Sequence, residues 1–272
     1  MQIVKVGDIK IGDKRTFVVV AGPCVIEKEK TVLTIAEKIK KITEELKISY
    51  IFKTSYDKSN RTSIYSYRGP GLKKGLEILK KVKQKIGVPI LTDVHCRTEI
   101  PYVAEVVDII QIPAFLCRQT DLIIEAAKTS KPINIKKGQF VAPWDVKHII
   151  EKVIYTGNKQ VIITERGTTF GYNNLVVDFR VFPIVHNFGY PILFDATHSV
   201  QLPSSKGDKS GGDRNFVPIL AKAAIAAGAN GLFMEVHSEP SCALSDSESM
   251  LKLDSLKSIL KDCVEIFKIV NR

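Results

Sequence analysis

The chain has 272 residues, of which 44% are hydrophobic, and it carries a formal net charge of +11. This length allows one large α/β barrel or two ordinary domains, and the five scattered cysteines, with no CxxC spacing, exclude a disulfide-rich secreted scaffold. No run of about 18 apolar residues is present, so we expect a cytoplasmic protein with reduced thiols and no membrane partner.

Short β-branched runs alternate with amphipathic stretches along the chain. Residues 1–15 alternate charged and β-branched residues and predict a two-stranded hairpin with a Gly-Asp turn. Strands are then predicted at residues 16–22, 49–55, 89–95, 108–115, 132–138, 160–167, 191–198 and 231–237. Stretches of helical period predict helices at residues 28–46, 71–87, 96–107, 118–130, 142–157, 175–189, 216–230 and 251–270.

Eight strand and helix pairs in about 250 residues are typical of a (β/α)8 TIM barrel in the α/β class. A doubly wound sheet usually has fewer strands, about five or six. We therefore predict one domain over residues 1–272, with the hairpin at 1–15 capping the N-terminal face of the barrel. The Gly- and Ser-rich segment 198–215 is expected to form a mobile loop over the active face.

Polar residues follow the predicted strands, at the barrel face where chemistry occurs in this fold. Six of them are cations that project to one face, namely Lys53, Lys58, Arg61, Arg118, Lys136 and Arg166. Lysine offers a point charge and arginine a planar fork, which together suit phosphate and carboxylate oxygens. The alternative is ion pairing with Asp93, Asp195 and Glu165, which are too few to pair all six.

The net charge also allows nucleic acid or an anionic surface as a partner. Most lysines, however, lie in stretches of helical period such as residues 71–87, interleaved with apolar positions. That pattern is typical of solvated helix faces, and we expect no nucleic-acid partner.

A second cluster combines a thiol, an imidazole and two carboxylates. Its members are Cys24, His198, Glu235 and Asp246. Taken alone, such a cysteine is usually core packing and such a histidine is often structural. The barrel topology brings all four to one rim, and mixed S, N and O ligands suit a divalent ion such as Zn²⁺, Fe²⁺ or Mn²⁺.

Six segments carry a resemblance to a known family, in the expected order and over nearly the whole chain. They are residues 52–72, 108–122, 134–140, 164–180, 194–203 and 228–240. The chain resembles the 3-deoxy-D-manno-octulosonate 8-phosphate synthases. That family condenses phosphoenolpyruvate with D-arabinose 5-phosphate and releases phosphate, forming an eight-carbon sugar acid used in lipopolysaccharide.

Two other functions remain open. The 3-deoxy-D-arabino-heptulosonate 7-phosphate synthases share the barrel and the phosphoenolpyruvate site but accept erythrose 4-phosphate. They usually carry a Lys-Pro-Arg-Thr type motif where this chain has KSNRTS, and an Asp-x-Ser-His strand end where it has DATHSVQ. The non-enzymatic alternative is a barrel that binds an anionic ligand.

The resemblance implies roles for individual residues. It assigns phosphoenolpyruvate to Lys53, Lys58, Gln111, Lys136 and Arg166, and the pentose phosphate to Asn60, Arg61 and Arg118, with Asp93 near its hydroxyls. Thr62 stands in the substrate site where relatives often have serine. The catalytic residues implied are Lys53, Lys58, Lys136 and His198. The family is homotetrameric, and its Arg61 segment reaches the sugar phosphate across a subunit boundary.

The family divides into metal-dependent enzymes, with cysteine at the position of Cys24, and metal-independent ones with asparagine there. The resemblance places this chain in the metal-dependent class, with His198, Glu235 and Asp246 as the remaining ligands. One departure is SESMLKL after Asp246, which lacks the Gly and Leu-Pro expected at that place.

Overall fold

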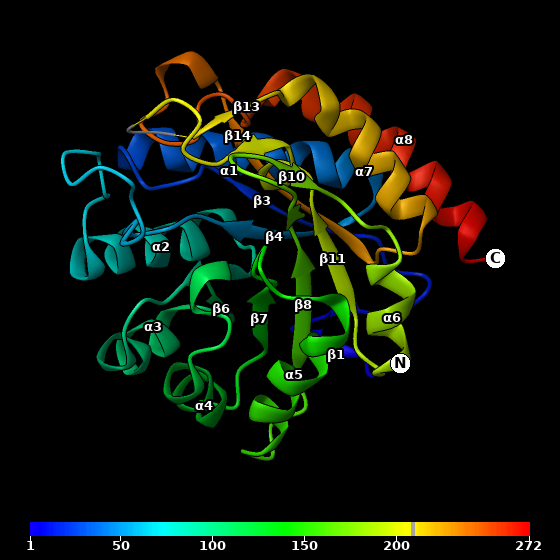
Figure 1. Ribbon diagram of the computed structural model, residues 1–272. Helices are drawn as coiled ribbons and strands as arrows, with labels where there is room; N and C mark the ends of the chain where they lie inside the picture. The colour runs from blue at the N-terminus through cyan, green and yellow to red at the C-terminus, as the bar shows by residue number, and fades with distance from the viewer. Residues whose placement is uncertain (208–209) are drawn as a thin grey trace.

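Eight parallel strands close into a barrel in the computed structural model of the protein, which describes residues 1–207 and 210–272 (Figure 1). Each strand pairs with the next along the chain, and the last pairs with the first. The strands are β3 (Val18–Gly22), β4 (Ser49–Lys53), β5 (Ile90–Asp93), β6 (Ile109–Ile112), β7 (Ile133–Lys136), β8 (Val161–Glu165), β11 (Ile192–Asp195) and β14 (Gly231–His237). The predicted (β/α)8 barrel is confirmed.

Helices surround the barrel. They are α1 (Glu29–Leu46), α2 (Leu72–Ile86), α3 (Ile100–Val106), α4 (Thr120–Lys128), α5 (Val146–Ile154), α6 (Val181–Asn187), α7 (Val217–Ala226) and α8 (Leu256–Val270). The buried residues of α1, Val32, Ile35 and Ile39, recur at helical spacing, which explains why a lysine-rich stretch packs on the sheet. Within the described residues, none of the helices is both long enough and apolar enough to cross a membrane.

Two of the predicted helical stretches begin with a short strand instead. Residues 175–176 form strand β10 (Leu175–Val176), which pairs antiparallel with β9 (Thr168–Thr169), and the helix starts only at Val181. Residues 251–252 form strand β15 (Leu251–Lys252), which pairs in parallel with the last two residues of β14. In both places backbone pairing with a neighbouring strand overrides the helical period of the apolar residues.

The N-terminal hairpin plugs one end of the barrel. Strands β1 (Val4–Val6) and β2 (Ile9–Ile11) pair antiparallel, and Val4, Val6 and Ile11 are buried. They pack against apolar side chains that point into the barrel: Val18, Val20, Ile51, Leu91, Ile109, Ile162, Leu193 and Phe233. The barrel interior is therefore a packed core at this end, and the predicted capping hairpin is confirmed.

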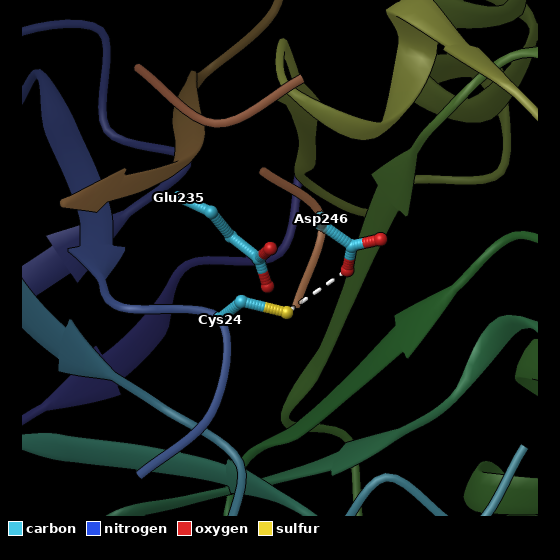
Figure 2. Close-up of side chains that lie close together, drawn as sticks. All are labelled: Cys24, Glu235 and Asp246. Atoms are coloured by element: carbon cyan, nitrogen blue, oxygen red, sulfur yellow. Dashed lines mark hydrogen bonds between the residues drawn. The ribbon is translucent and has the colours of Figure 1, made fainter. Parts of the chain in front are cut away.

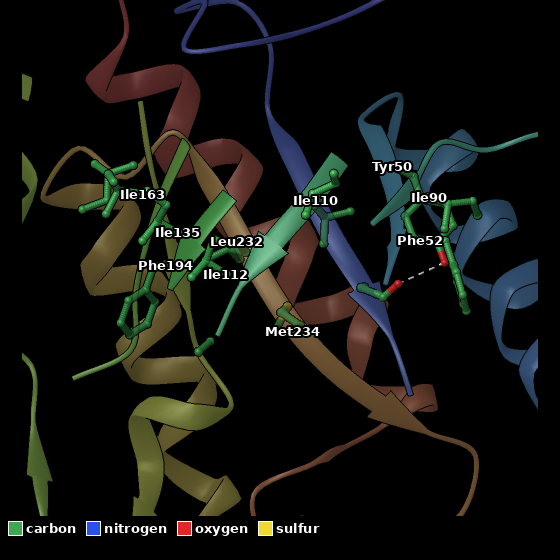
Figure 3. Packing of buried hydrophobic residues seen from close by; sticks show 14 of the residues in the cluster. Tyr50, Phe52, Ile90, Ile110, Ile112, Ile135, Ile163, Phe194, Leu232 and Met234 are labelled. Carbon is green, nitrogen blue, oxygen red and sulfur yellow. Dashed lines mark hydrogen bonds between the residues drawn. The ribbon is translucent and has the colours of Figure 1, made fainter. Parts of the chain in front are cut away.

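Side-chain alternation along each strand separates the outer core from the interior. On β6, Ile110 and Ile112 belong to the outer core that packs under the helices (Figure 3). Ile109 of the same strand belongs to the interior core. Because successive side chains of a strand point to opposite faces, Gln111 shares the interior with Ile109. The same rule turns the last inward residue of several strands toward the open end of the barrel.

Segment 198–215 contains two short strands, β12 (Gln201–Leu202) and β13 (Gly211–Gly212), which pair antiparallel. The predicted mobile loop thus includes a small hairpin, and residues 208 and 209 lie outside the described part of the chain. Its mobility stays a prediction.

Candidate active site and metal centre

A cleft of about 720 Å³ opens at the C-terminal ends of the barrel strands. Its lining contains eleven of the residues predicted for the site, namely Lys53, Lys58, Asn60, Arg61, Thr62, Asp93, Gln111, Lys136, Arg166, His198 and Asp246. Arg118 is exposed and is not part of this lining. The strand ends thus gather most of the predicted residues from seven separate parts of the sequence around one cavity.

Three acidic groups meet at one side of the cleft. Ligand atoms of Cys24, Glu235 and Asp246 all lie within 4.8 Å of one another, and Cys24 Sγ is 2.9 Å from Asp246 Oδ2 (Figure 2). Cys24 lies two residues after the end of β3, Glu235 lies on the neighbouring β14, and Asp246 belongs to the segment after β14. Closure of the barrel therefore explains how residues at opposite ends of the chain meet.

His198 lies beside this group. Its Nε2 is 3.5 Å from Glu235 Oε2 and 3.9 Å from Asp246 Oδ2, while its Nδ1 is 2.7 Å from Asp195 Oδ2. The buried Asp195 also accepts hydrogen bonds from the backbone N–H groups of Thr197 and His198. A carboxylate on Nδ1 fixes the imidazole so that Nε2 faces the acidic group, which is the usual arrangement of a metal-binding histidine.

The protonation states in this cluster are shifted by burial and by mutual charge. Burial, and then the charges of Asp246 and Glu235, raise the pKa of Cys24 well above its ordinary value. Burial alone would also raise the pKa of Glu235, but electrostatic interactions with His198 and then with Lys58 hold it below its ordinary value. Without a metal the thiol is therefore protonated and donates to Asp246.

The donor set fits a divalent cation. A thiol and two carboxylates in a buried site repel one another once ionised, and a cation between them removes this cost. Cysteine, histidine and carboxylates together suit zinc, iron or manganese. Cys24, His198, Glu235 and Asp246 would hold such an ion.

Three of the predicted cations pair with carboxylates in the cleft. Lys53 Nζ lies 3.3 Å from Glu235 Oε1 and 3.9 Å from Asp93 Oδ1, and Lys58 Nζ lies 3.8 Å from Glu235 Oε1. Lys136 contacts Asp195. The alternative of ion pairs with Asp93, Asp195 and Glu165 thus describes Lys53 and Lys136, whereas Lys58 pairs with Glu235. For Arg61, Arg118 and Arg166, no carboxylate partner is found among residues 1–207 and 210–272.

Lys136 is a buried residue of the cleft lining. Its Nζ is 3.2 Å from the centroid of the Phe233 ring, on which it packs as a cation over an aromatic face. Burial lowers the pKa of Lys136 to about 8, although the charge of Asp195 opposes this shift. Lys136 is 5% exposed, so an anion that reaches it must shed water.

Arg166 is held by two neutral amides. Its Nη1 donates to Gln139 Oε1 at 2.7 Å and its Nη2 donates to Gln201 Oε1 at 2.5 Å. Burial lowers the pKa of Arg166, but an arginine remains charged across the physiological range. The guanidinium is fixed in direction while its charge stays available for an anion.

One end of the cleft holds the predicted pentose phosphate residues other than Arg118. Arg61 Nε donates to the carbonyl oxygen of Tyr67 at 2.9 Å, and within the described chain its buried Nη2 finds no hydrogen-bond partner. Asn60 and Thr62 beside it are exposed. Ser55 Oγ donates to Asp93 Oδ1 at 2.6 Å and accepts from Lys53 Nζ at 3.0 Å, which ties this end of the cleft to Glu235.

Sequence reasoning missed the two glutamines, Gln139 and Gln201, and the linking serine, Ser55. All three lie within the segments that carry the family resemblance, at 52–72, 134–140 and 194–203. That was the one signal available for them, because neutral side chains give no charge pattern.

The whole chain, residues 1–272, matches the DAHP synthetase I family. It is similar to curated proteins named 2-dehydro-3-deoxyphosphooctonate aldolase. The protein from Geotalea daltonii is 56% identical over 98% of this chain and 98% of its own length. Those from Geobacter sp. strain M21 and Geobacter sulfurreducens are 54% and 52% identical, over 99% and 98% of this chain and 98% of their own lengths.

Proposed function

The chain belongs to the DAHP synthetase I family, and we propose that it condenses phosphoenolpyruvate with D-arabinose 5-phosphate and water, giving 3-deoxy-D-manno-octulosonate 8-phosphate and phosphate. The single observation that carries this conclusion is the set of near full-length relatives named for the octulosonate enzyme. Their names support this reaction and not the heptulosonate alternative. The eight-carbon product is the one used for lipopolysaccharide.

The reaction requires two anionic substrates to meet in one orientation. C3 of phosphoenolpyruvate attacks the aldehyde carbon of the pentose while water adds to C2, and the resulting intermediate expels phosphate by C–O cleavage. Lys53, Lys58, Lys136 and Arg166 offset the carboxylate and phosphate charges, with Gln111 beside them in the cleft. Fixed cations in a buried site lower the barrier through orientation and through electrostatic stabilisation.

The metal centre is part of the proposal. A divalent ion held by Cys24, His198, Glu235 and Asp246 would supply Lewis-acid chemistry, through acidified water or a polarised aldehyde oxygen. The donor set, with Cys24 and Glu235 buried and His198 and Asp246 half-buried, supports this assignment. His198 contributes its Nε2, which Asp195 orients through Nδ1.

We also propose that the enzyme acts as a homotetramer in the cytoplasm. Next to Arg61, the adjacent large side chains of Ile64 and Tyr65 are 83% and 95% exposed. A second subunit packed on this segment would cover them and place Arg61 at a shared site, as the family resemblance implies. Size-exclusion chromatography with light scattering tests the tetramer.

Phosphate release tests the reaction itself. The purified protein is supplied with phosphoenolpyruvate and either D-arabinose 5-phosphate or erythrose 4-phosphate. We expect release with the pentose phosphate, and faster release with erythrose 4-phosphate would establish the heptulosonate reaction instead. Release with neither would leave an anion-binding barrel. Arg166→Gln should be inactive, while Arg180→Gln, which removes a 78% exposed side chain paired with Asp178, is the matched control.

A further inference from the structure

Gln201 joins two parts of the site that are described separately above. Its Oε1 accepts from Arg166 Nη2 at 2.5 Å, and its Nε2 donates to Asp246 Oδ1 at 2.9 Å. The side chain is 8% exposed and begins β12, directly after the turn that carries His198. One amide therefore spans the distance between the anion-binding arginine and a metal-binding carboxylate.

The orientation of this amide is set by its neighbours. A guanidinium only donates hydrogen bonds, and an ionised carboxylate only accepts them. Turning the amide over would place its NH₂ group against Arg166 and its oxygen against Asp246, and both hydrogen bonds would be lost. Gln201 consequently fits only when an arginine is on one side and a carboxylate is on the other.

The two oxygens of Asp246 have different neighbours. Oδ1 accepts from Gln201, whereas Oδ2 faces Cys24 Sγ at 2.9 Å and His198 Nε2 at 3.9 Å. Asp246 also has a positive φ of 49°, a backbone conformation that non-glycine residues adopt rarely. The hydrogen bond from Gln201 therefore directs one oxygen away so that the other points to the metal centre.

Gln139 provides a natural comparison, because it holds the same guanidinium and has no hydrogen bond to a metal-binding residue among those described. Its Oε1 accepts from Arg166 Nη1 at 2.7 Å, and it is 9% exposed, close to the value for Gln201. The two glutamines differ in one respect that matters here. Only Gln201 reaches Asp246.

We propose that Gln201 is a positioning residue that couples divalent-metal binding at Asp246 to anion binding at Arg166. A metal that fixes Asp246 also fixes Gln201 and hence Arg166, so the anion binds to a guanidinium that is already ordered. Coupling between two sites is reciprocal, so the anion must tighten metal binding by the same factor. This inference rests on the proposed function, which supplies phosphoenolpyruvate as the anion.

Equilibrium binding tests the coupling without turnover. Metal-stripped full-length protein is titrated with Cd²⁺, followed by the ultraviolet charge-transfer band of the Cys24 thiolate, with and without saturating phosphoenolpyruvate. In the natural protein we expect phosphoenolpyruvate to tighten Cd²⁺ by about fivefold or more. Gln201→Met should weaken Cd²⁺ about tenfold and reduce that coupling factor toward one.

Gln139→Met is the matched control. It should weaken phosphoenolpyruvate, measured by calorimetry, while leaving the Cd²⁺ affinity and the coupling factor as they are in the natural protein. Direct attraction between the metal and the anion acts in both variants, so their difference isolates the contribution of Gln201. Thermal melting checks that each variant folds, and Gln201→Leu replaces the methionine variant if that one does not.

The outcomes separate the two proposals. If the natural protein binds Cd²⁺ and phosphoenolpyruvate but both glutamine variants keep the same coupling factor, the role of Gln201 is wrong and the proposed function stands. If the natural protein binds neither ligand, the proposed function itself fails.

Discussion

Cys24 Sγ and Asp246 Oδ2 lie 2.9 Å apart although 222 positions separate them in the chain. The contact exists because β14 pairs with β3 and closes the barrel, so that the segments after these two strands share one rim. Burial raises the pKa of the Cys24 thiol, which keeps a proton between sulfur and carboxylate when no metal is bound. Binding of a divalent ion must displace that proton.

Replacement of Cys24 by asparagine tests the metal assignment. A chelator should abolish turnover of the natural protein, and Mn²⁺, Cd²⁺ or Zn²⁺ should restore part of it. Cys24→Asn should keep measurable turnover, roughly 10- to 100-fold below the natural protein, and should no longer respond to chelators, because asparagine cannot supply a thiolate ligand. The exposed Cys242, changed to serine, is the control and should remain chelator-sensitive. Full activity of the metal-free natural protein would contradict the assignment.

Lys136 should set an alkaline limit on substrate capture. Its pKa is lowered to about 8 by burial, so the side chain is cationic below that pH and neutral above it. We expect kcat/KM for phosphoenolpyruvate to fall above about pH 8, since this ratio reports ionisations of the free enzyme. Lys136→Arg keeps its charge at alkaline pH and should move the decline in kcat/KM to higher pH, whatever its effect on the maximal kcat/KM. An unchanged alkaline limb in that variant would rule out Lys136 as its source.

Loss of Arg61 should act on one substrate. Its buried Nη2 has no hydrogen-bond partner among the residues that the structure describes and can bind an anion. A hydrogen bond to a charged group is worth about 2 kcal/mol, which corresponds to roughly thirtyfold in affinity. Arg61→Gln should therefore raise KM for arabinose 5-phosphate by about tenfold or more and change KM for phosphoenolpyruvate by less than about twofold. Steady-state kinetics with each substrate varied in turn measure both values, and equal changes would refute the assignment.

The absence of a side chain at Gly22 allows β3 and β4 to lie close together, and the site and the stability of the barrel depend on this packing. A Cβ atom built there would lie 2.0 Å from the carbonyl oxygen of Lys53 on the adjacent strand. Gly22→Ala must push β3 and β4 apart, and we expect a loss of about 3 kcal/mol in the free energy of unfolding.

Gly7→Ala provides the comparison. An added Cβ at Gly7 meets nothing within 4 Å, and its φ of 56° leaves only backbone strain, worth about 1 kcal/mol. Denaturant unfolding of both variants measures the difference, and equal losses would show that the close approach at Gly22 is relaxed at little cost.

The sequence predicts the barrel because its signals are local and repeated. All eight barrel strands, the capping hairpin and the helical stretches follow from side-chain period. The predicted starts of α6 and α8 were wrong because residues 175–176 and 251–252 pair with the strands β9 and β14, and the period of their own side chains does not reveal this pairing. The assignment of residues 1–272 to one domain stays a prediction.

The candidate site was less accessible from sequence. Charged residues at strand ends stand out as unnecessary for a core, and Lys53, Asp93 and Glu235 were found in this way. Gln139 and Gln201 carry no charge, and what they do depends on which groups the folded chain places at each end of the amide. Such a role can be recognised only when the positions of both hydrogen-bond partners of the amide are known.

The hairpin of β1 and β2 limits the route by which substrates enter and products leave. Val4, Val6 and Ile11 close the N-terminal end of the barrel, so the site is open only at the other end, through the cleft that Arg61 and Asp246 line. Both substrates must enter through this opening, and the sugar acid and the freed phosphate must leave through it. Products therefore leave by the same route by which the next substrates arrive. Phosphate that has not yet left binds the same cationic side chains that the next phosphoenolpyruvate needs.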